Sequence, residues 1–372
     1  MKILSISSDR KVFEEGSAVR TRTREYGRLA DEIHVIVFAK KSHRYKDTVL
    51  PPNIFLHPTN TKTRLGYIFS AIIYARALAR RGVKFDLVTA QDPFELGFTA
   101  FFIARMVGAK LHLQVHTDFM SPYFTKESLV NRVRSILARY LVRRADALRV
   151  VSERIKESLQ GVDVPIRVLP IFVDVEHIVQ SPVAKNLKDV YPQFEKHILM
   201  ASRLSPEKNI ELAVLAMSEV AKKSPTTGLV IVGSGVQEKA LKEKVRTLNI
   251  QSRVVFEGWQ NDLTSYYKTA DIFLLTSNYE GYGMTIVEAM AAGCPVVATD
   301  VGCVGEVLRH GEQGLIVPVG DKDALVRAIL DLLSGKVAVT SSMPKLYSKE
   351  EYLAQYRASW QDTLSDFPKY KN

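Results

Sequence analysis

The chain has 372 residues, which is enough for two domains of ordinary size, each with its own core. Hydrophobic residues make up 46% of it and charged residues 24%, a composition typical of a globular protein and unlike that of disordered or fibrous chains. The formal net charge is +11 at pH 7, and the two cysteines are too few for a disulfide framework or a four-thiolate metal site.

The positive charge is concentrated in the first half of the chain. Residues 1–180 contain 29 Lys and Arg against 18 Asp and Glu, whereas residues 181–372 contain 22 of each sign. Such an asymmetry indicates that one half of a protein faces an anionic partner, such as nucleic acid or a membrane surface.

The amino-terminal stretch MKILSISSDR has one lysine and then a short apolar run interrupted by serines. It lacks the long apolar segment of a secretory signal, so we expect a cytoplasmic protein. Two later apolar runs, near residues 65–74 and 96–103, are too short to span a bilayer and are followed by arginines.

Short apolar strands alternate with helical segments, such as 129–145, along the first half of the chain. The expected strands there are KILSIS (2–7), IHVIVF (33–38), FDLVTA (85–90) and KLHLQVH (110–116). The alternation resumes after residue 195 with the strands HILMASR (197–203), GLVIVG (228–233), RVVFEG (253–258), DIFLLTS (271–277) and PVVATD (295–300). This order predicts an α/β protein with two parallel sheets, each covered by helices on both faces.

A break separates the two runs. Residues 170–197 contain three prolines and no strong periodicity, which favours a linker. We therefore predict a first Rossmann-like domain over 1–172, a linker over 173–195, a second Rossmann-like domain over 196–345, and a carboxyl-terminal helix over 346–372 that crosses back to the first domain.

The stretch EGYGMTIVEAMAAGCPVVATD places two glutamates on either side of a strand-to-helix turn. Glu280 follows a buried strand, at the sheet edge where open parallel sheets bind ligands. Glu288 lies early in the next helix, which Gly293 ends, and helical side chains lean back toward the helix start. Gly281 and Gly283 let a ligand approach the backbone, and the helix start attracts an anion.

A second loop of the same sheet carries two cations. ASRLSPEKN follows the first strand of the second domain and places Arg203 and Lys208 where they can neutralise a diphosphate. Carboxylates beside an anion site suit a ligand with both hydroxyls and phosphates, such as a nucleotide sugar. The ordinary alternatives are a solvated loop and a helix with an exposed acidic residue near its start.

Three other motifs do not support a different chemistry. GSGVQEK begins like a dinucleotide fingerprint, but Glu238 stands where the third glycine belongs. Asp321-Lys322-Asp323 spells a metal-binding pattern, yet it opens a helix, where capping explains both aspartates. A phosphate-binding P-loop is absent from the sequence. The two cysteines, Cys294 and Cys303, are expected to be reduced and to act as small apolar residues.

From about residue 196 to 333 the chain resembles the retaining glycosyltransferases of family 4, which have the two-domain GT-B fold. The motifs are SRLSPEKN, VIVGSG, VVFEGW, ADIFLLTSNYEGYGMTIVEAMAAGCPVVATDVGCVGEV and GLIVPVGD. In the first half only the initial strand, GSAVRTR and QVHTD match. The single Gly16 stands where relatives often have paired glycines, which puts the usual first-loop contacts to phosphate or acceptor in question.

The resemblance implies roles for the matched residues of the second domain, which would bind the donor. Glu288 would contact the ribose of the donor, and Glu280 would contact the transferred sugar. The donor diphosphate would contact Arg203, Lys208, Gly283, Met284 and Thr285. The nucleobase would lie beside Gly258, Trp259 and Gln260.

The first domain would bind the acceptor. His116 matches a family histidine near the sugar, although unaided it reads as a structural histidine at a strand end. Gly16, Ser17 and Arg20 would form the acceptor side or first loop.

The function implied is transfer of a sugar from a UDP- or GDP-linked donor to a sugar or lipid-linked acceptor, with retention, no metal and no further cofactor. Cell-surface glycan or glycolipid synthesis fits this activity. A sugar-nucleotide epimerase or a pyridoxal-phosphate phosphorylase shares the architecture, so fold alone does not select transfer. A basic nucleic-acid-binding protein is the alternative of another class, but no recognition motif for nucleic acid is present, so none is expected as a partner.

Two segments of the basic half combine apolar and basic residues. KESLVNRVRSILARYLVRRA (126–145) has apolar residues at helical spacing among arginines, and RLGYIFSAIIYARALARRG (64–82) ends in a basic cluster. Both can be sheet-covering helices with solvated arginines. Alternatively, this half rests on an anionic membrane surface, peripheral to the inner face of the plasma membrane.

Overall fold

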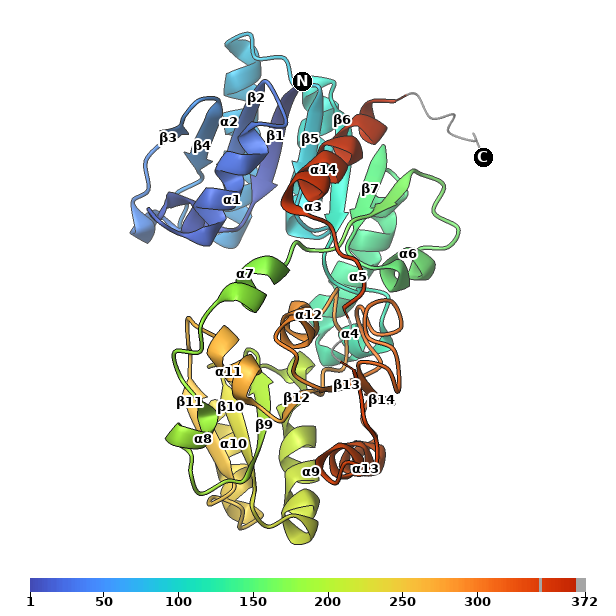
Figure 1. Ribbon diagram of the computed structural model, residues 1–372. Coiled ribbons are helices and arrows are strands. Elements are labelled where there is room, and N and C mark those ends of the chain that lie inside the picture. The colour runs from blue at the N-terminus through green and yellow to red at the C-terminus, as the bar shows by residue number, and fades with distance from the viewer. Residues whose placement is uncertain (341–342, 366–372) are drawn as a thin grey trace. The chain divides into compact units, whose positions relative to one another are not determined.

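The computed structural model describes residues 1–340 and 343–365 and divides into two compact units (Figure 1). Unit 1 holds residues 1–120, 128–170 and the described part of 347–372, and unit 2 holds residues 121–127 and the described part of 171–346. Each unit is built on its own sheet, so the prediction of an α/β protein with two parallel sheets is confirmed.

The sheet of unit 1 has eight strands among the described residues, in the order β3-β4-β2-β1-β5-β6-β7-β8, and only β3 is antiparallel to its neighbour. The strands are β1 (Lys2–Ser7), β2 (Glu32–Val37), β3 (Thr48–Leu50), β4 (Ile54–Pro58), β5 (Leu87–Ala90), β6 (Lys110–Val115), β7 (Ala147–Val150) and β8 (Ile166–Val168). The four expected strands are confirmed as β1, β2, β5 and β6, and the other four were not predicted.

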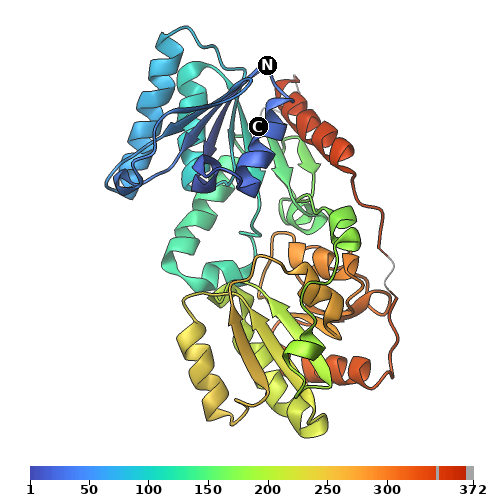
Figure 2. The same cartoon turned by 60° about the vertical axis from the view of Figure 1, so that its left-hand side comes forward.

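Helices cover both faces of this sheet. They are α1 (Ala18–Gly27), α2 (Arg64–Arg80), α3 (Glu95–Val107), α5 (Leu129–Val142), α6 (Glu153–Ser158) and α14 (Lys349–Leu364), with the short 3-10 helices η1 (Arg10–Phe13) and η2 (Lys41–His43). Figure 2 shows α1 and α14 on one face and α2 and α3 on the other. Because α3 contacts both α2 and α5, these three helices form one continuous layer.

The helix α14 is fastened to unit 1 by a buried arginine of β7. Arg149 donates from Nη1 to Gln114 Oε1 at 2.9 Å and from Nη2 to the Tyr352 hydroxyl at 3.1 Å. Its guanidinium also lies 4.6 Å from the ring centroid of Tyr356, a cation–π contact. The last described element of the chain is therefore part of the packed core of unit 1.

The sheet of unit 2 is parallel, with the order β11-β10-β9-β12-β13-β14. Its strands are β9 (Lys196–Ala201), β10 (Thr227–Val232), β11 (Val254–Gly258), β12 (Ile272–Leu275), β13 (Val296–Thr299) and β14 (Gly314–Val317). All five strands expected in this half are confirmed, and β14 is additional. The Val, Ile and Leu residues of β9, β10, β12 and β13 are buried on both faces of the sheet, as a parallel sheet between helices requires.

The helices of unit 2 are α4 (Pro122–Glu127), α7 (Val175–Gln180), α8 (Leu187–Val190), α9 (Ile210–Lys223), α10 (Glu238–Thr247), α11 (Thr264–Thr269), α12 (Met284–Ala291) and α13 (Lys322–Leu333), with the 3-10 helix η3 (Pro206–Lys208). The helix α13 begins as predicted: Asp321 caps it by accepting a hydrogen bond from the backbone N–H of Ala324 at 2.8 Å.

The segment expected to be a linker holds α7 and α8, which pack against α12 and α11. Lys268 Nζ donates to the carbonyl oxygen of Val179 at 2.8 Å, and the backbone N–H of Ala184 donates to Ser265 Oγ at 3.0 Å. These contacts make the segment after residue 170 a structural part of unit 2.

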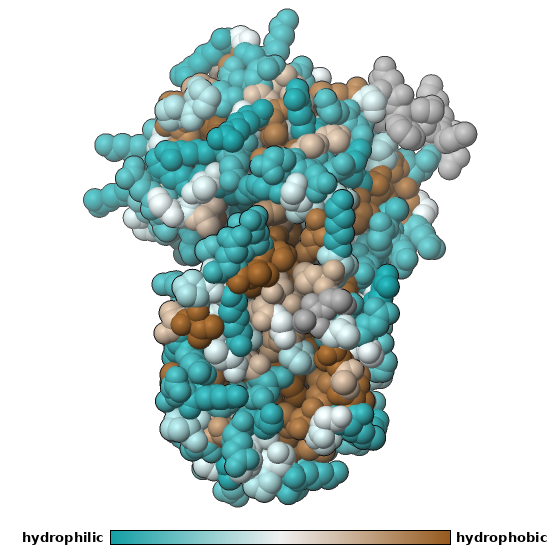
Figure 3. Space-filling view, in the orientation of Figure 1, coloured by the Kyte–Doolittle hydropathy of each residue, from teal (hydrophilic) through white to brown (hydrophobic). Residues whose placement is uncertain are grey.

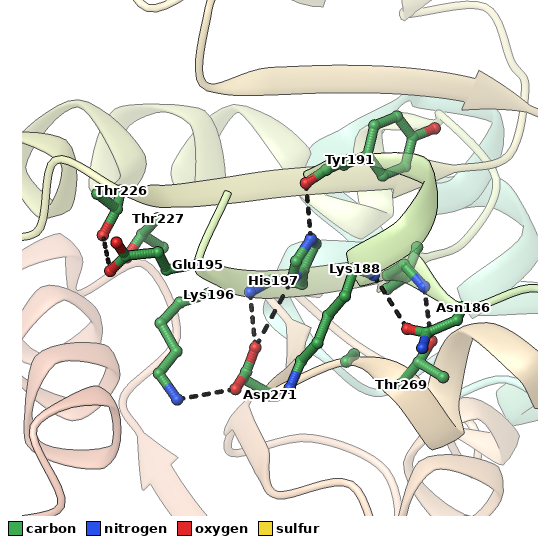
Figure 4. Close-up of polar contacts among 12 residues, drawn as sticks. Asn186, Lys188, Tyr191, Glu195, Lys196, His197, Thr226, Thr227, Thr269 and Asp271 are labelled. Atoms are coloured by element: carbon green, nitrogen blue, oxygen red, sulfur yellow. Dashed lines mark hydrogen bonds and ion pairs between the residues drawn. The ribbon is translucent and has the colours of Figure 1, made fainter. Parts of the chain in front are cut away.

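A half-buried aspartate joins the amino ends of β9 and β12 (Figure 4). Asp271 accepts hydrogen bonds from the His197 backbone N–H at 2.8 Å and from Lys196 Nζ at 3.0 Å. Burial alone would raise the pKa of Asp271, but these hydrogen bonds lower it to about 2. Because the carboxyl ends of the same strands lie at the opposite sheet edge, this cluster stabilises the sheet away from the ligand-binding edge.

The outside of the molecule is mostly hydrophilic on the face drawn in Figure 3. Over the described residues, no helix is both long enough and apolar enough to cross a membrane. Cys294 and Cys303 are both buried, in keeping with the apolar role expected of them.

Candidate functional site

A pocket of about 420 Å³ opens in unit 2 at the carboxyl ends of β9, β10 and β12. Three segments that follow strands of the sheet line it: the loop after β9, the turn after β11, and the loop and helix after β12. It lies where a parallel α/β sheet places its ligands. Its lining contains eight residues singled out from the sequence: Arg203, Lys208, Trp259, Gln260, Glu280, Met284, Thr285 and Glu288.

An ion pair lies in this pocket. Lys208 Nζ donates to Glu280 Oε1 at 2.5 Å, and their side chains are only 17% and 13% exposed. Ser277 Oγ donates to the same carboxylate oxygen at 2.7 Å. The lysine and glutamate, predicted for different parts of one ligand, are therefore in direct contact, and a ligand that meets one will meet the other.

Arg203 is held differently. Its side chain is 70% exposed, and Nη2 lies 3.0 Å from Glu207 Oε1. Ser205 Oγ donates to the same oxygen at 2.6 Å, which fixes the carboxylate within the loop. Arg203 is thus poised at the pocket rim, with an acidic partner that the sequence interpretation did not assign.

The loop after β9 packs against the glycines of VIVGSG. Gly233 has φ of +140°, and a Cβ placed on it would lie 1.9 Å from the carbonyl oxygen of Ser202. A Cβ on Gly235 would lie 2.3 Å from the carbonyl oxygen of Leu204. Glycine is therefore required here for one loop to press on the other, which explains the motif without a dinucleotide fold.

The helix α12 points its amino end toward the pocket. Gly283 precedes it with φ of +93°, and no side chain of the described structure caps the helix. The backbone N–H groups of Met284 and Thr285 belong to this first turn, where the helix dipole and orphan donors favour an anion. Met284 and Thr285 line the pocket, so this helix start faces the same space as Lys208.

Glu288, one turn further along α12, is held by a tyrosine. The Tyr267 hydroxyl donates to Glu288 Oε2 at 2.9 Å, and Tyr267 itself is only 2% exposed. Burial raises the pKa of Glu288, and the hydrogen bond from Tyr267 opposes that rise. The second oxygen remains available to a ligand that reaches the pocket wall.

The turn after β11 forms another wall. Gly258 has φ of +71°, and its carbonyl oxygen accepts a hydrogen bond from the Gly233 backbone N–H at 2.7 Å. Trp259 is 64% exposed and lines the pocket, whereas Gln260 Nε2 donates to Glu257 Oε2 at 3.2 Å. The turn thus offers one broad aromatic surface beside a fixed amide.

The side chain of Glu257, the residue before Gly258, holds that turn in place through its hydrogen bonds. Burial opposes its ionisation, but hydrogen bonds from Lys185, Tyr191 and Tyr266 outweigh burial and lower the pKa of Glu257. Lys185 Nζ lies 2.9 Å from the carboxylate. Sequence reasoning missed this cluster, because Lys185 and Tyr191 lie in the segment expected to be a linker.

The remaining predicted residues belong to unit 1. His116 follows β6, and its Nε2 lies 3.2 Å from Gln114 Oε1. Burial, with the nearby charge of Arg149 and Arg22, lowers the pKa of His116 to about 3, so the imidazole is neutral at pH 7. Because Gln114 Oε1 can only accept, the neutral ring donates through Nε2, which leaves Nδ1 as a hydrogen-bond acceptor.

The first loop of unit 1 is ordered by its own contacts. Ser17 caps α1 by accepting a hydrogen bond from the Arg20 backbone N–H at 3.2 Å. Arg20 Nη1 donates to the carbonyl oxygen of Phe13 at 3.3 Å, and Gly16 has φ of +74°. Gly16, Ser17 and Arg20 all belong to unit 1.

Among the residues that the structure describes, no three His, Cys, Asp or Glu side chains gather as they would around a metal ion. The expectation of a metal-free site stays a prediction.

Two family descriptions match the two halves of the chain. Residues 17–177 match Glycosyltransferase Family 4, and residues 188–351 match Glycosyl transferases group 1. Together the two matches extend over both units, including the first half of the chain, where fewer sequence motifs match the family.

Two named synthases are among the relatives of this chain. The chain is 31% identical to the alpha-monoglucosyldiacylglycerol synthase of Streptococcus pneumoniae over 67% of this chain, and it spans 59% of the length of that relative. It is 24% identical to the N-acetyl-alpha-D-glucosaminyl L-malate synthase of Bacillus anthracis, over 91% of this chain and 92% of that one.

Solved structures share the fold over nearly the whole chain. HepE of Anabaena, solved in complex with UDP-glucose, superimposes with a TM-score of 0.69 at 20% identity, over 98% of this chain and 94% of that one. The sucrose-phosphate synthase of Thermosynechococcus elongatus gives a TM-score of 0.69 at 20% identity, over 98% and 95% of the two chains. The GT-B fold expected from the sequence is confirmed.

Proposed function

This chain belongs to glycosyltransferase family 4, and we propose that it moves a sugar from a nucleotide-sugar donor to an acceptor hydroxyl with retention of anomeric configuration. The family works without a metal ion, and the donor is a cosubstrate rather than a resident cofactor.

The pocket of unit 2 is the observation that carries this proposal. A nucleotide sugar presents an anionic diphosphate between two groups rich in hydroxyls, so its site needs cations or N–H donors next to carboxylate acceptors. The pocket has both, because Lys208 and the start of α12 lie beside Glu280 and Glu288.

Each lining residue takes one part of the donor in this proposal. Lys208, Arg203 and the backbone of Gly283, Met284 and Thr285 hold the diphosphate, Glu288 accepts from the ribose hydroxyls, Glu280 accepts from the transferred sugar, and the turn of Gly258, Trp259 and Gln260 faces the nucleobase. The nucleotide is UDP or GDP. HepE was solved with UDP-glucose, whereas a relative from Mycolicibacterium smegmatis is named as GDP-mannose-dependent.

The chemical step follows from where charge develops. Cleavage of the bond between the anomeric carbon and the diphosphate oxygen leaves negative charge on the departing diphosphate. Lys208, Arg203 and the N–H groups of α12 stabilise that charge through preorganised contacts. The acceptor oxygen forms its bond to the anomeric carbon on the face that the diphosphate leaves, which retains the configuration, and the hydroxyl proton of the acceptor passes to the departing diphosphate oxygen. A neutral His116 hydrogen-bonds the sugar.

Unit 1 binds the acceptor in this proposal, with the first loop of Gly16, Ser17 and Arg20 on the acceptor side. The acceptor is a sugar or a lipid-linked group, which suits a cytoplasmic enzyme of cell-surface glycan or glycolipid synthesis. The named relatives support this range, since one is a diacylglycerol glycolipid synthase and another glycosylates malate.

Two substitutions test the donor site. Lys208→Ala and Arg203→Ala should each weaken nucleoside diphosphate binding by about 2 kcal/mol, the value of one lost charge-assisted hydrogen bond. Isothermal calorimetry with UDP and GDP measures this, and a panel of nucleotide sugars then identifies the transferred sugar.

The matched control is Lys222→Ala. Lys222 pairs with Glu219 at 3.0 Å on the outer surface of α9. The substitution therefore removes the same kind of ion pair at a place away from the pocket. Its affinity should equal that of the wild type. Unchanged affinity in both pocket variants would refute the assignment of the diphosphate site.

A further inference from the structure

The helix α5 turns its apolar side chains toward solvent. Leu129 is 74% exposed and Ile136 is 70% exposed. Val133 and Tyr140, which follow them at the same helical spacing, are exposed as well. These positions follow the 3.6-residue period, so they form one stripe along the helix.

The inward face of α5 has the opposite character. Asn131, Ser135 and Ala138 are buried, and Ser135 Oγ donates to the carbonyl oxygen of Phe119 at 3.1 Å. A helix that only covered the sheet would bury its apolar stripe and leave its small and polar residues outside. Except in the last turn of α5, where Leu141 and Val142 are buried, the amphipathicity of the helix is therefore inverted, and burial in the core of unit 1 does not explain its apolar stripe.

The neighbouring helices continue the exposed apolar surface. On α2, Leu65, Phe69 and Ile73 are exposed at intervals of four residues, while Ala71 and Ala75 of the same helix are buried. On α3, which contacts both α2 and α5, Phe102 and Met106 are exposed. We call this layer of α2, α3 and α5 the three-helix face.

Arginines accompany these apolar residues. The three helix sequences contain seven arginines and a single acidic residue, Glu95, which pairs with Arg134 at 2.8 Å. On α2 the exposed Arg76 and Arg80 continue the stripe of Phe69 and Ile73. The face is thus apolar along its stripes and cationic beside them.

We infer that the three-helix face docks on the surface of an anionic lipid bilayer. Apolar side chains at helical spacing enter the boundary between headgroups and acyl chains, and the flanking arginines contact anionic headgroups. The inference rests on the proposed function in one respect, because it places a transferase of lipid-linked acceptors where such acceptors lie.

Other occupants fit this face less well. A second copy of the chain in a two-fold interface would bring the same arginines against one another. Nucleic acid would satisfy the charge but would leave the aliphatic stripes of Leu65, Ile73, Leu129 and Ile136 without an apolar partner.

Flotation with phosphatidylcholine vesicles, with and without phosphatidylglycerol, tests the inference on the full chain. Wild-type protein should bind only the anionic vesicles, and more weakly at high ionic strength. Replacing Arg76, Arg80 and Arg139 together by Gln should weaken binding roughly 100-fold, since each basic residue near lipid contributes about 1 kcal/mol and about 1.4 kcal/mol is tenfold.

A second variant removes the apolar stripe. Replacing Leu129, Val133 and Ile136 together by Gln changes only exposed positions, so folding should be retained, and binding should fall at least tenfold. The matched control replaces Lys239, Lys242 and Arg246 of α10 by Gln, which removes the same charge from an exposed helix of unit 2 and should leave vesicle binding unchanged.

Nucleoside diphosphate binding by the same variants separates this inference from the proposed function, because the donor pocket is untouched in both. Absent binding to anionic vesicles, or an equal loss in the α10 control, would overturn the docking face even if UDP or GDP still binds. Concentration-dependent dimerisation that both face variants abolish would overturn it in favour of a second copy.

Discussion

Tyr267 controls the charge of Glu288 through a single hydrogen bond, so the change Tyr267→Phe isolates that effect. The hydroxyl lies 2.9 Å from Glu288 Oε2, and it counters the rise in pKa that burial imposes on Glu288. Phenylalanine keeps the ring in its buried position and removes only the donor. A hydrogen bond to a charged group is worth about 1.5–3 kcal/mol, and its loss lets burial raise the pKa of Glu288 further.

The sign of the effect follows from which form binds ribose. Two ribose hydroxyls need an ionised acceptor, so binding requires the carboxylate. In the phenylalanine variant the pKa of Glu288 is higher still, and affinity for UDP or GDP should begin to fall at a higher pH than in the wild type. Calorimetry across the acidic and neutral range measures the displaced profile.

A neighbouring tyrosine supplies the control for this experiment. Tyr266 is equally buried but donates to Glu257 at 3.0 Å instead, so Tyr266→Phe should leave the pH midpoint of nucleotide binding in place. An unchanged profile in the Tyr267 variant, or the same displacement in both variants, would refute the claim that Tyr267 positions and ionises Glu288 for a ligand.

Two further substitutions test the frame that holds the site. Asp271→Asn should lower the free energy of unfolding at pH 7 by about 2 kcal/mol, because the pKa of Asp271 is about 2 against an ordinary 3.8. That stability is present above pH 4 and is lost as the pH falls toward 2. The free energies of unfolding of wild type and variant, measured by denaturant melts, should therefore converge in acid. A difference that stays constant with pH would contradict the ion-pair account. Gly233→Ala forces a Cβ against the Ser202 carbonyl at 1.9 Å and should weaken nucleoside diphosphate binding by displacing the loop of Arg203, whereas wild-type affinity would show that the glycine contact does not shape the pocket.

The sequence predicted best those features that local pattern determines. The strands of unit 2 and the helix start after Gly283 are written in continuous apolar runs and one glycine-bearing turn, so their place at the sheet edge followed directly. Strands β3 and β8 were missed because each has only three residues in the structure, too few for a period to be recognised.

Partners that are distant in sequence were out of reach. Tyr267 meets Glu288 across 21 residues, and Lys208 meets Glu280 across 72, so no spacing rule links them. The sequence also did not determine which side of α5 faces the sheet, because periodicity identifies an apolar stripe but not whether that stripe faces the sheet or solvent. Only the burial of Asn131 and Ser135 settles that question.

Hydrogen–deuterium exchange with and without UDP or GDP tests the central claim most directly. The nucleotide that binds should protect backbone amides of residues 202–208, 258–260 and 283–288 in unit 2, and that protection should be lost in the Lys208→Ala variant. Protection confined to unit 1, or no effect of either nucleotide at saturating concentration, would contradict the account of unit 2 as the donor site.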